Sequence, residues 1–190
     1  MPTFISMLRG INVGGHNRVK MDRLKALYEG LGFREVRTYI QSGNVVFRSA
    51  TRSAARLAER IQESIAAEFG FEVTVILRTP GELEKVLREN PFRTAAEAKG
   101  SRVHVVFLSE TPARRAVREL EEEETGRQEL RVAGREIYLH TPDGYVPTKL
   151  DTNFLERALS VQATARNWNS VKKLHEMARG GAVGKDARER

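Results

Sequence analysis

Short strand-like runs alternate with helical patterns over the first 78 residues, and this order restricts the fold more than any other feature of the sequence. Apolar residues at helical spacing between Met21 and Leu31 predict a helix that Gly32 ends. A second helix is expected from about Ser53 to Gly70. The predicted strands are Thr3–Leu8, Val36–Ile40, Val45–Phe47 and Phe71–Leu77. The resulting order, β-α-β-β-α-β, predicts an α+β fold with a ferredoxin-like N-terminal half.

The second half of the chain repeats part of this order, as β-α-β-β. Its predicted strands are Val103–Leu108, Leu130–Val132 and Glu136–His140, and its predicted helices start at Thr111 and cover Leu150–Leu159 and Asn167–Ala178. A degenerate duplication agrees with this order, although no residue-level repeat supports it. Between the halves, Thr79 and Glu82 form a capping-box pattern that begins a helix, and Arg93–Ser101 is expected to be a connector.

The chain therefore divides into four expected parts. They are a ferredoxin-like subdomain (1–78), a helix and connector (79–101), a second α+β subdomain with C-terminal helices (102–178) and a disordered tail (179–190). No apolar run approaches the roughly 20 residues that a membrane crossing requires. The first ten residues lack the pattern of a signal peptide. A cytoplasmic protein is therefore expected.

Two loops of the first half are expected to lie side by side. In a right-handed β-α-β crossover the first and second strands run parallel, and the hairpin returns the third strand between them. The loop Arg9–Lys20 and the hairpin Gln41–Asn44 then meet at one edge of the sheet, where the second strand also ends near Thr38. The polar residues gathered at this edge are Arg9, Asn12, His16, Arg18, Gln41, Ser42 and Asn44.

Positive charge is concentrated in the same part of the chain. The whole sequence carries a formal net charge of +7. Residues 1–48 hold eight Lys or Arg against three Asp or Glu, so this quarter alone contributes +5. Such a field attracts phosphates, nucleic acid or acidic partners. Ordinary solubilising charge is the alternative interpretation.

The glycine-rich loop, Gly10-Ile11-Asn12-Val13-Gly14-Gly15, joins a strand to a helix. Backbone N–H groups in such a loop can approach an anion at the helix N-terminus. The loop matches neither the dinucleotide fingerprint nor the P-loop. The alternative is a tight loop that needs a positive φ at Gly14 or Gly15. The hairpin has two similar interpretations: Ser42 and its neighbours contact a ligand, or Gly43 simply completes a well-formed turn.

Further candidates lie towards the C-terminus. Arg166, Asn167 and Asn169 stand at a helix start, either as capping groups or as part of a polar site. Lys149 is a candidate phosphate-binding cation, or else a solvated lysine. Trp168 follows a helical apolar stripe and is expected in the core.

The sequence indicates no metal site, no cofactor and no catalytic residue. The absence of cysteine excludes disulfides, thiolate nucleophiles and cysteine-based metal sites. The four histidines are scattered, so zinc is not expected. His16 is a candidate general base or a surface histidine, and Ser42 has no neighbouring base. An RNA-recognition motif shares the strand order, but its basic-Gly-aromatic signature is missing, so base stacking on the sheet is not expected.

Three segments together resemble a bacterial family, the one called domain of unknown function 1697. They are Leu8-Arg9-Gly10-Ile11-Asn12-Val13-Gly14-Gly15, Thr38-Tyr39-Ile40-Gln41-Ser42-Gly43-Asn44-Val45-Val46-Phe47 and Arg166-Asn167-Trp168-Asn169. The resemblance covers roughly residues 3–178 and implies a small cytosolic protein of ferredoxin-like α+β architecture, with no established activity. Members often carry Ser where this chain has Thr148. The resemblance makes the three segments the best site candidates.

The leading hypothesis is a binding protein or enzyme for a phosphate-bearing small molecule such as a nucleotide. The alternatives are nucleic-acid binding by the basic N-terminal region, with a strong salt dependence, and a non-catalytic interaction module with exposed sheet edges. No membrane partner is expected, and the oligomeric state is open. The candidate ligand-binding residues are Arg9, Gly10, Asn12, Gly14, Gly15, Arg18, Thr38, Gln41, Ser42, Asn44, Lys149, Arg166, Asn167 and Asn169.

Overall fold

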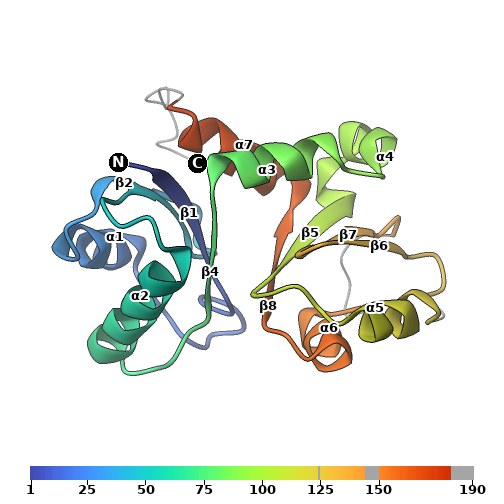
Figure 1. The fold of residues 1–190 in the computed structure, drawn as a ribbon, viewed down its shortest axis with the longest axis horizontal. Helices are drawn as coiled ribbons and strands as arrows, with labels where there is room; N and C mark the ends of the chain where they lie inside the picture. The colour runs from blue at the N-terminus through green and yellow to red at the C-terminus, as the bar shows by residue number, and fades with distance from the viewer. Residues whose placement is uncertain (124, 144–149, 181–190) are drawn as a thin grey trace.

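Two four-stranded antiparallel sheets, covered by helices, form the framework of the protein (Figure 1). The computed structural model describes residues 1–123, 125–143 and 150–180. The α+β fold expected from the sequence is confirmed. Each sheet belongs to one half of the chain, and the two sheets meet near the strands β4 and β8 in the middle of the molecule (Figure 1).

The first half follows the predicted order of elements. They are β1 (Thr3–Leu8), α1 (Met21–Gly30), β2 (Arg34–Tyr39), β3 (Asn44–Arg48), α2 (Ala54–Phe69) and β4 (Val75–Arg78). The strands lie in the order β2-β3-β1-β4 with all neighbours antiparallel, which is consistent with a ferredoxin-like arrangement. The ends of α2 agree with the sequence: Ser53 Oγ accepts the N–H of Arg56, and Gly70 has a left-handed φ of 78°.

The second half contains a strand that the sequence analysis did not predict. Its elements are β5 (Val103–Leu108), α5 (Arg114–Glu121), β6 (Glu129–Ala133), β7 (Glu136–His140), α6 (Thr152–Leu159) and β8 (Ala163–Asn167). The strand order β6-β7-β5-β8 repeats that of the first half, because β8 supplies the fourth strand. The sequence of β8, Ala-Thr-Ala-Arg-Asn, has low strand propensity. Antiparallel pairing with the fully buried β5 therefore imposes its conformation.

Two short helices and one 3-10 turn link the halves, and a last helix follows β8. These elements are α3 (Pro80–Arg88), α4 (Arg93–Ala98), η1 (Gly100–Arg102) and α7 (Trp168–Ala178). The predicted capping box of Thr79 and Glu82 begins α3. The expected connector Arg93–Ser101 contains α4 and the start of η1 instead of irregular chain. Most of the tail expected over 179–190 lies outside the described residues.

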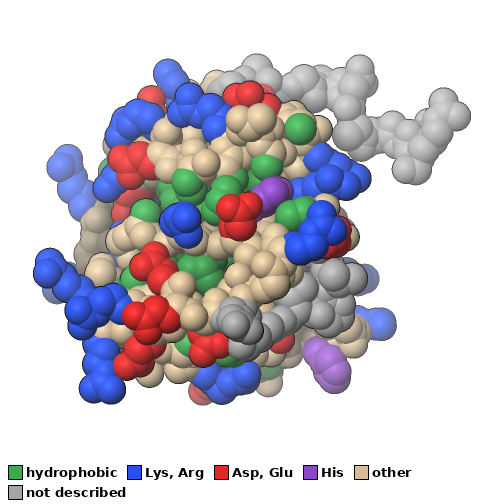
Figure 2. Space-filling model, turned by 90° about the vertical axis from the view of Figure 1, so that its right-hand side faces the viewer, with side chains coloured by type: hydrophobic (Ala, Val, Ile, Leu, Met, Phe, Trp, Pro, Cys, Tyr) green, Lys and Arg blue, Asp and Glu red, His purple; other side chains and the backbone are tan. Residues whose placement is uncertain are grey.

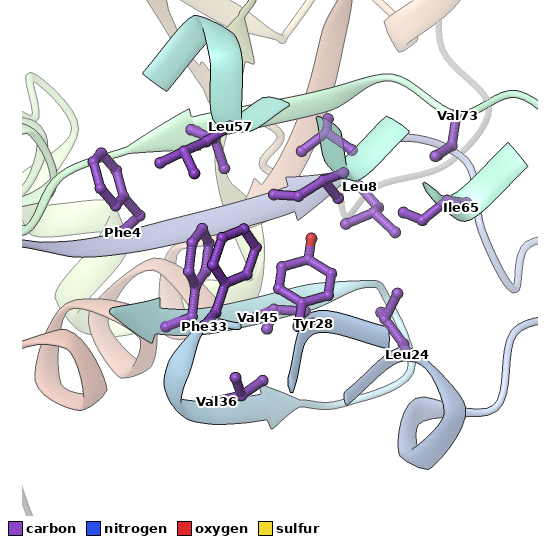
Figure 3. Packing of buried hydrophobic residues seen from close by; sticks show 14 of the residues in the cluster. Phe4, Leu8, Leu24, Tyr28, Phe33, Val36, Val45, Leu57, Ile65 and Val73 are labelled. Carbon is purple, nitrogen blue, oxygen red and sulfur yellow. The ribbon is translucent and has the colours of Figure 1, made fainter. Parts of the chain in front are cut away.

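Helices α1 and α2 cover one face of the first sheet. Figure 3 shows Phe4, Phe33 and Tyr28 among the aliphatic side chains packed there. The Tyr28 hydroxyl lies 2.7 Å from Ser6 Oγ in β1, and burial raises the pKa of Tyr28 well above its ordinary value. The phenol is therefore a neutral, hydrogen-bonded member of the core.

Helices α3 and α7 lie across the two sheets and share a core with residues of both, and this shared core joins the halves. Its members include Ile5 from the first sheet, Val105 from the second sheet and Trp168 from α7. Trp168 is a core residue, as expected. Because α5 and α6 cover the remaining face of the second sheet, each sheet has helices on both faces. Phe4 and Phe47 lie beneath α1 and α2, so they are not available to stack on nucleic-acid bases.

The surface of the second half carries charges of both signs. Figure 2 shows Lys and Arg side chains interspersed with Asp and Glu on this face, around hydrophobic side chains near its centre. A mixed surface of this kind does not form a large field of one sign. None of the helices in the described part of the chain combines the length and the apolar character that a membrane crossing needs.

Candidate functional site

The last strand of each half carries a buried arginine that reaches into the other half. Arg78 ends β4 and is 1% exposed, and Arg166 lies in β8 and is 6% exposed. We call Arg78 with its hydrogen-bond acceptors the Arg78 clasp, and Arg166 with its hydrogen-bond acceptors the Arg166 clasp. The two clasps occupy matching places, because Arg78 pairs with Ile5 in β1 and Arg166 pairs with Val105 in β5.

The Arg78 clasp includes a carboxylate. The guanidinium donates through Nε to Glu136 Oε1 at 2.8 Å, which forms an ion pair. Its remaining acceptors are the backbone oxygens of Leu77 (2.9 Å), Leu108 (2.8 Å) and Arg135 (3.1 Å). Burial lowers the pKa of Arg78, and the charge of Glu136 opposes that shift. The buried cation is thus neutralised within the protein.

The Arg166 clasp has the same plan but only neutral acceptors. They are Asn44 Oδ1 (2.6 Å) for Nε, Thr164 Oγ1 (2.7 Å) and Ala165 O (2.8 Å) for Nη1, and Leu8 O (2.8 Å) and Ser42 O (2.9 Å) for Nη2. These acceptors occupy all five N–H donors of the guanidinium. Burial lowers the pKa of Arg166 to about 10, so the group remains charged near pH 7.

The acceptors of the two clasps correspond position by position. Leu8 and Leu108 are the last residues of the first strand in each half. Asn44 and Glu136 are the first residues of the third strand. An amide therefore stands where the other half has a carboxylate. Within the described residues, no carboxylate forms an ion pair with Arg166.

The helices that follow the two arginines differ in the same way. The third position of α3 holds a carboxylate, whereas the third position of α7 holds a neutral residue. Thr79 caps α3, and Glu82 at its third position completes the capping box. Burial raises the pKa of the Glu82 carboxyl, but hydrogen bonds from Thr79 and the nearby cations outweigh burial and leave the pKa lowered. Asn167 caps α7 by accepting the N–H of Ser170, which occupies the third position. The first turn of α7 contains no acidic residue.

A cleft of about 610 Å³ lies beside the Arg166 clasp, between the two halves. Its walls come from the glycine-rich loop, the β2–β3 hairpin, the start of α6 and the junction of β8 with α7. Arg166, Asn167 and Ser170 line one wall, and Ser42 lines another. Small-molecule sites commonly have volumes of about 300–1,000 Å³. The cleft is therefore large enough for a metabolite.

Loop length distinguishes the surroundings of the two clasps. The loop after β1 covers residues 9–20, whereas the loop after β5 covers 109–113. The hairpin before β3 covers 40–43, whereas the hairpin before β7 covers only 134–135. The longer loops of the first half supply the cleft walls that contain Val13, Ile40 and Ser42.

The two loops that topology places together do lie side by side. The N–H of Leu8 donates to Gly43 O at 2.9 Å, and Asn12 Nδ2 donates to Gln41 O at 2.8 Å. Asn12 also holds both backbone groups of Val19 across its own loop. The predicted adjacency is confirmed, and Asn12 is the side chain that ties the loops together.

Gly14, Gly15 and Gly43 of these loops have a positive φ, and at one of them a side chain would also clash. Gly14 and Gly15 have φ values of 59° and 81°, as the tight-loop interpretation predicts. Gly43 has a φ of 73°, and a Cβ there would lie 2.8 Å from Leu8 Cβ and from Ile11 Cδ1. The hairpin therefore packs directly on the end of β1.

Arg9 lines the cleft, but its charge is compensated. Its Nε donates to Glu156 Oε1 at 2.6 Å and its Nη2 to Glu156 Oε2 at 2.5 Å, which is a bidentate pair. Arg9 Nη2 also donates to Asn153 Oδ1. Glu156 accepts the N–H of Ala163 in addition. Arg9 thus connects the first loop to α6 and β8.

The structure divides the other sequence candidates among several places. Asn12, Gly15, Arg18 and Gln41 line a separate hollow of about 850 Å³ at the start of α1. Gly10 lines the cleft, and Gly14 lies in the loop tip. Thr38 lies within β2 opposite Val45. Asn44 is fully buried, and Asn169 is exposed with its amide against Gly100. Lys149 lies outside the described residues.

Several cleft residues were missed at the sequence level. Ser170 and Thr164 belong to the α7 start and to the unpredicted strand β8. Ile40 has a φ of 47°, which a β-branched residue rarely adopts. No local signal marks this conformation, because Ile40 ends a strand-like run, whereas Gly or Asn is usual in a left-handed turn position.

His104 in β5 also lines the cleft. Burial lowers its pKa to about 4, so the imidazole is neutral near pH 7. Among residues 1–123, 125–143 and 150–180, no group of three or more potential ligands could hold a metal ion. The cleft thus combines neutral polar groups with one buried cation.

The protein is thus an α+β protein of two sheets with a cleft at the junction of its halves. The profile of the family described as "Protein of unknown function (DUF1697)" matches residues 1–138, and the chain belongs to this family. The structure is similar to that of the conserved bacterial protein SP0830 from Streptococcus pneumoniae, with a TM-score of 0.77 and 25% sequence identity. That similarity covers 94% of this chain and 99% of the other. No curated protein matches the chain in sequence.

Proposed function

We propose that the cleft binds a phosphate-bearing small molecule, whose negative charge compensates Arg166. The observation that carries the proposal is the contrast between the clasps: Arg78 has Glu136, whereas Arg166 has only Asn44. A buried charge without a counter-ion is costly, because the interior solvates it poorly. An anion in the adjoining cleft offsets that cost in the bound state.

Arg166 acts on such a ligand through its charge rather than through direct hydrogen bonds. Its five N–H groups are already engaged, so the guanidinium is a fixed positive centre behind the wall. Ser42 Oγ accepts from Asn44 Nδ2 at 2.8 Å, which leaves the Ser42 hydroxyl proton to donate into the cleft. The start of α7 adds a favourable helix dipole on the same side.

The basic N-terminal quarter contributes less to the proposal than its net charge suggests. Arg9 is paired with Glu156, Arg23 with Glu68 and Arg48 with Glu35. Paired cations attract an additional anion only weakly. The proposal therefore rests on Arg166, which is not one of the residues in that quarter. A cytoplasmic location, where phosphorylated metabolites are abundant, is part of the proposal.

The test is to install the missing carboxylate. Asn44→Asp places a negative charge at the position that Glu136 occupies in the other clasp, and it keeps an acceptor for Arg166 Nε. Isothermal titration calorimetry with inorganic phosphate and a panel of phosphorylated metabolites is expected to show binding to the natural protein. The Asn44→Asp variant is expected to bind at least tenfold more weakly, while its circular dichroism spectrum is unchanged.

A matched control carries the same charge change away from the cleft. Ala55→Asp adds a carboxylate to the exposed first turn of α2. Its affinity for the same probes is expected to stay within about twofold of the natural value. The proposal is wrong if no phosphate compound binds, or if Asn44→Asp and Ala55→Asp weaken binding equally.

A further inference from the structure

Two exposed hydrophobic side chains stand at the cleft. Among the described residues, the large hydrophobic side chains that are exposed are Met1, Val13 and Ile40. Met1 is the first residue, whereas Val13 (65% exposed) and Ile40 (51% exposed) both line the cleft. Single exposed apolar residues need no explanation. Two in one cleft, from two separate loops, form an apolar surface at a concave site.

The backbone at Ile40 strengthens this observation. Its φ of 47° lies in the left-handed region, where a β-branched residue is strained. Asn12 and Asn17 adopt the same region in the neighbouring loop, with φ values of 55° and 47°. Asn is the residue that turn chemistry favours at such a position. The Ile side chain therefore costs stability and exposes apolar surface without improving the turn.

We infer that the ligand is a phosphate monoester with a flat aromatic group, and that Val13 and Ile40 hold this group. The inference rests on the proposed function, because it uses the Arg166 side of the same cleft for the phosphate. Apolar side chains next to a polar wall match a ligand with one apolar end and one anionic end. Burying an aromatic face against two aliphatic side chains removes apolar surface from water.

The cleft contains the two kinds of wall that such a ligand needs. The polar residues of its lining include Ser42, Asn167, Ser170 and the buried Arg166. The apolar residues of its lining include Ile11, Val13 and Ile40. Inorganic phosphate uses only the first set. A mononucleotide, with its base, sugar and phosphate, uses both.

The experiment compares probes that share a phosphate and differ in the aromatic group. The probes are AMP, UMP and phenyl phosphate, against ribose 5-phosphate and inorganic phosphate. At least one aromatic probe is expected to bind tenfold or more tightly than inorganic phosphate. Ile40→Asn and Val13→Thr are expected to reduce this advantage to threefold or less when combined, with inorganic phosphate affinity unchanged.

Two controls separate binding from folding. Ile40→Val keeps a branched apolar side chain and is expected to retain most of the advantage. Ile40→Asn relieves the backbone strain, so its melting temperature is expected to stay the same or to rise. A variant that is at least as stable and yet loses only the aromatic advantage cannot be explained by misfolding.

The possible outcomes distinguish this inference from the proposed function. If all phosphate probes bind equally, and Asn44→Asp weakens them, the anion site stands and the aromatic inference fails. If an aromatic advantage exists but survives the combined Ile40→Asn and Val13→Thr change, the assignment to these two residues fails. If no probe binds, the proposed function fails and the inference fails with it.

Discussion

The Arg78 clasp and the Arg166 clasp have the same plan, but only the first contains a counter-ion for its arginine. Each arginine lies in the last strand of its own half. Its guanidinium donates hydrogen bonds to two places in the other half, the end of the first strand and the hairpin before the third strand. Around Arg78, Glu136 and Glu82 supply negative charge. The matching positions around Arg166 are the neutral residues Asn44 and Ser170.

The difference teaches that joining the halves does not require an uncompensated charge. Arg78 joins them with a counter-ion and short loops. Arg166 joins them with neutral acceptors, longer loops and an adjoining cleft. The Arg166 clasp therefore differs from the Arg78 clasp in three respects, which are its lack of a counter-ion, its longer loops and its adjoining cleft.

The largest expected effect comes from removing the counter-ion of the Arg78 clasp. Glu136→Ala removes the counter-ion of Arg78, which is only 1% exposed. Because a buried charge is left unpaired, the free energy of unfolding is expected to fall by roughly 3–5 kcal/mol in urea denaturation. Glu136→Gln keeps an acceptor and imitates Asn44, so its loss is expected to be about half as large. Equal stability of both variants and the natural protein would show that the ion pair is dispensable.

The next effect concerns His104, which has Phe4 at the matching position of the first half. Its folded-state pKa of about 4 lies below the ordinary histidine value near 6.5. The unfolded chain therefore takes up the proton first, and stability is lost as pH falls from about 6.5 to about 4, by roughly 3 kcal/mol. His104→Gln is expected to flatten this part of the curve of unfolding free energy against pH. An unchanged curve would show that protonation of His104 does not cause this loss of stability.

The hairpin glycines provide a smaller, matched comparison. Gly43 and Gly134 both have positive φ, but only at Gly43 would a Cβ meet neighbours within 4 Å. Gly134→Ala is expected to cost about 1–2 kcal/mol from the backbone alone. Gly43→Ala adds the clash with Leu8 and Ile11, and is expected to cost about 2 kcal/mol more. Thermal unfolding of both variants measures the difference, and equal losses would show that the hairpin does not pack tightly on β1.

The smallest expected effect is a gain in affinity. Glu156→Gln removes the carboxylate that pairs with Arg9 and keeps an acceptor for Ala163. The cleft then has a second uncompensated cation beside it. Anion affinity in calorimetry is expected to rise about threefold, or roughly 0.7 kcal/mol. Weaker binding would mean that Arg9 must be held by Glu156 for the cleft to form.

Local patterns predicted the elements with strong signals of their own. β5 matches its predicted bounds, and the capping box and the αL glycine after α2 stand where expected. β8 was missed, because its strand conformation depends on pairing with β5 and not on its own residues. The sequence therefore showed the repeat only in part, as β-α-β-β, and the fourth strand of the second sheet was not predicted.

The candidate site was predictable only where strand topology determines which loops meet. Strand topology predicts that the two loops of the first half meet, and Asn12 and Gln41 confirm it. The pairing of Arg166 with Asn44 joins residues 122 positions apart, and no local pattern encodes it. The missing carboxylate becomes visible only when the two halves are compared residue by residue in space.

The distance along the chain between Arg166 and its partners has a consequence for protein synthesis. The guanidinium binds Leu8, which leaves the ribosome 158 residues earlier. The first half can form its sheet and helices while the rest is still being made. The glycine-rich loop and the hairpin belong to this half, but Arg166, which lines the cleft beside them, is synthesised later as part of β8. A nascent chain that stops short of β8 therefore lacks the strand that carries Arg166 and forms part of the cleft.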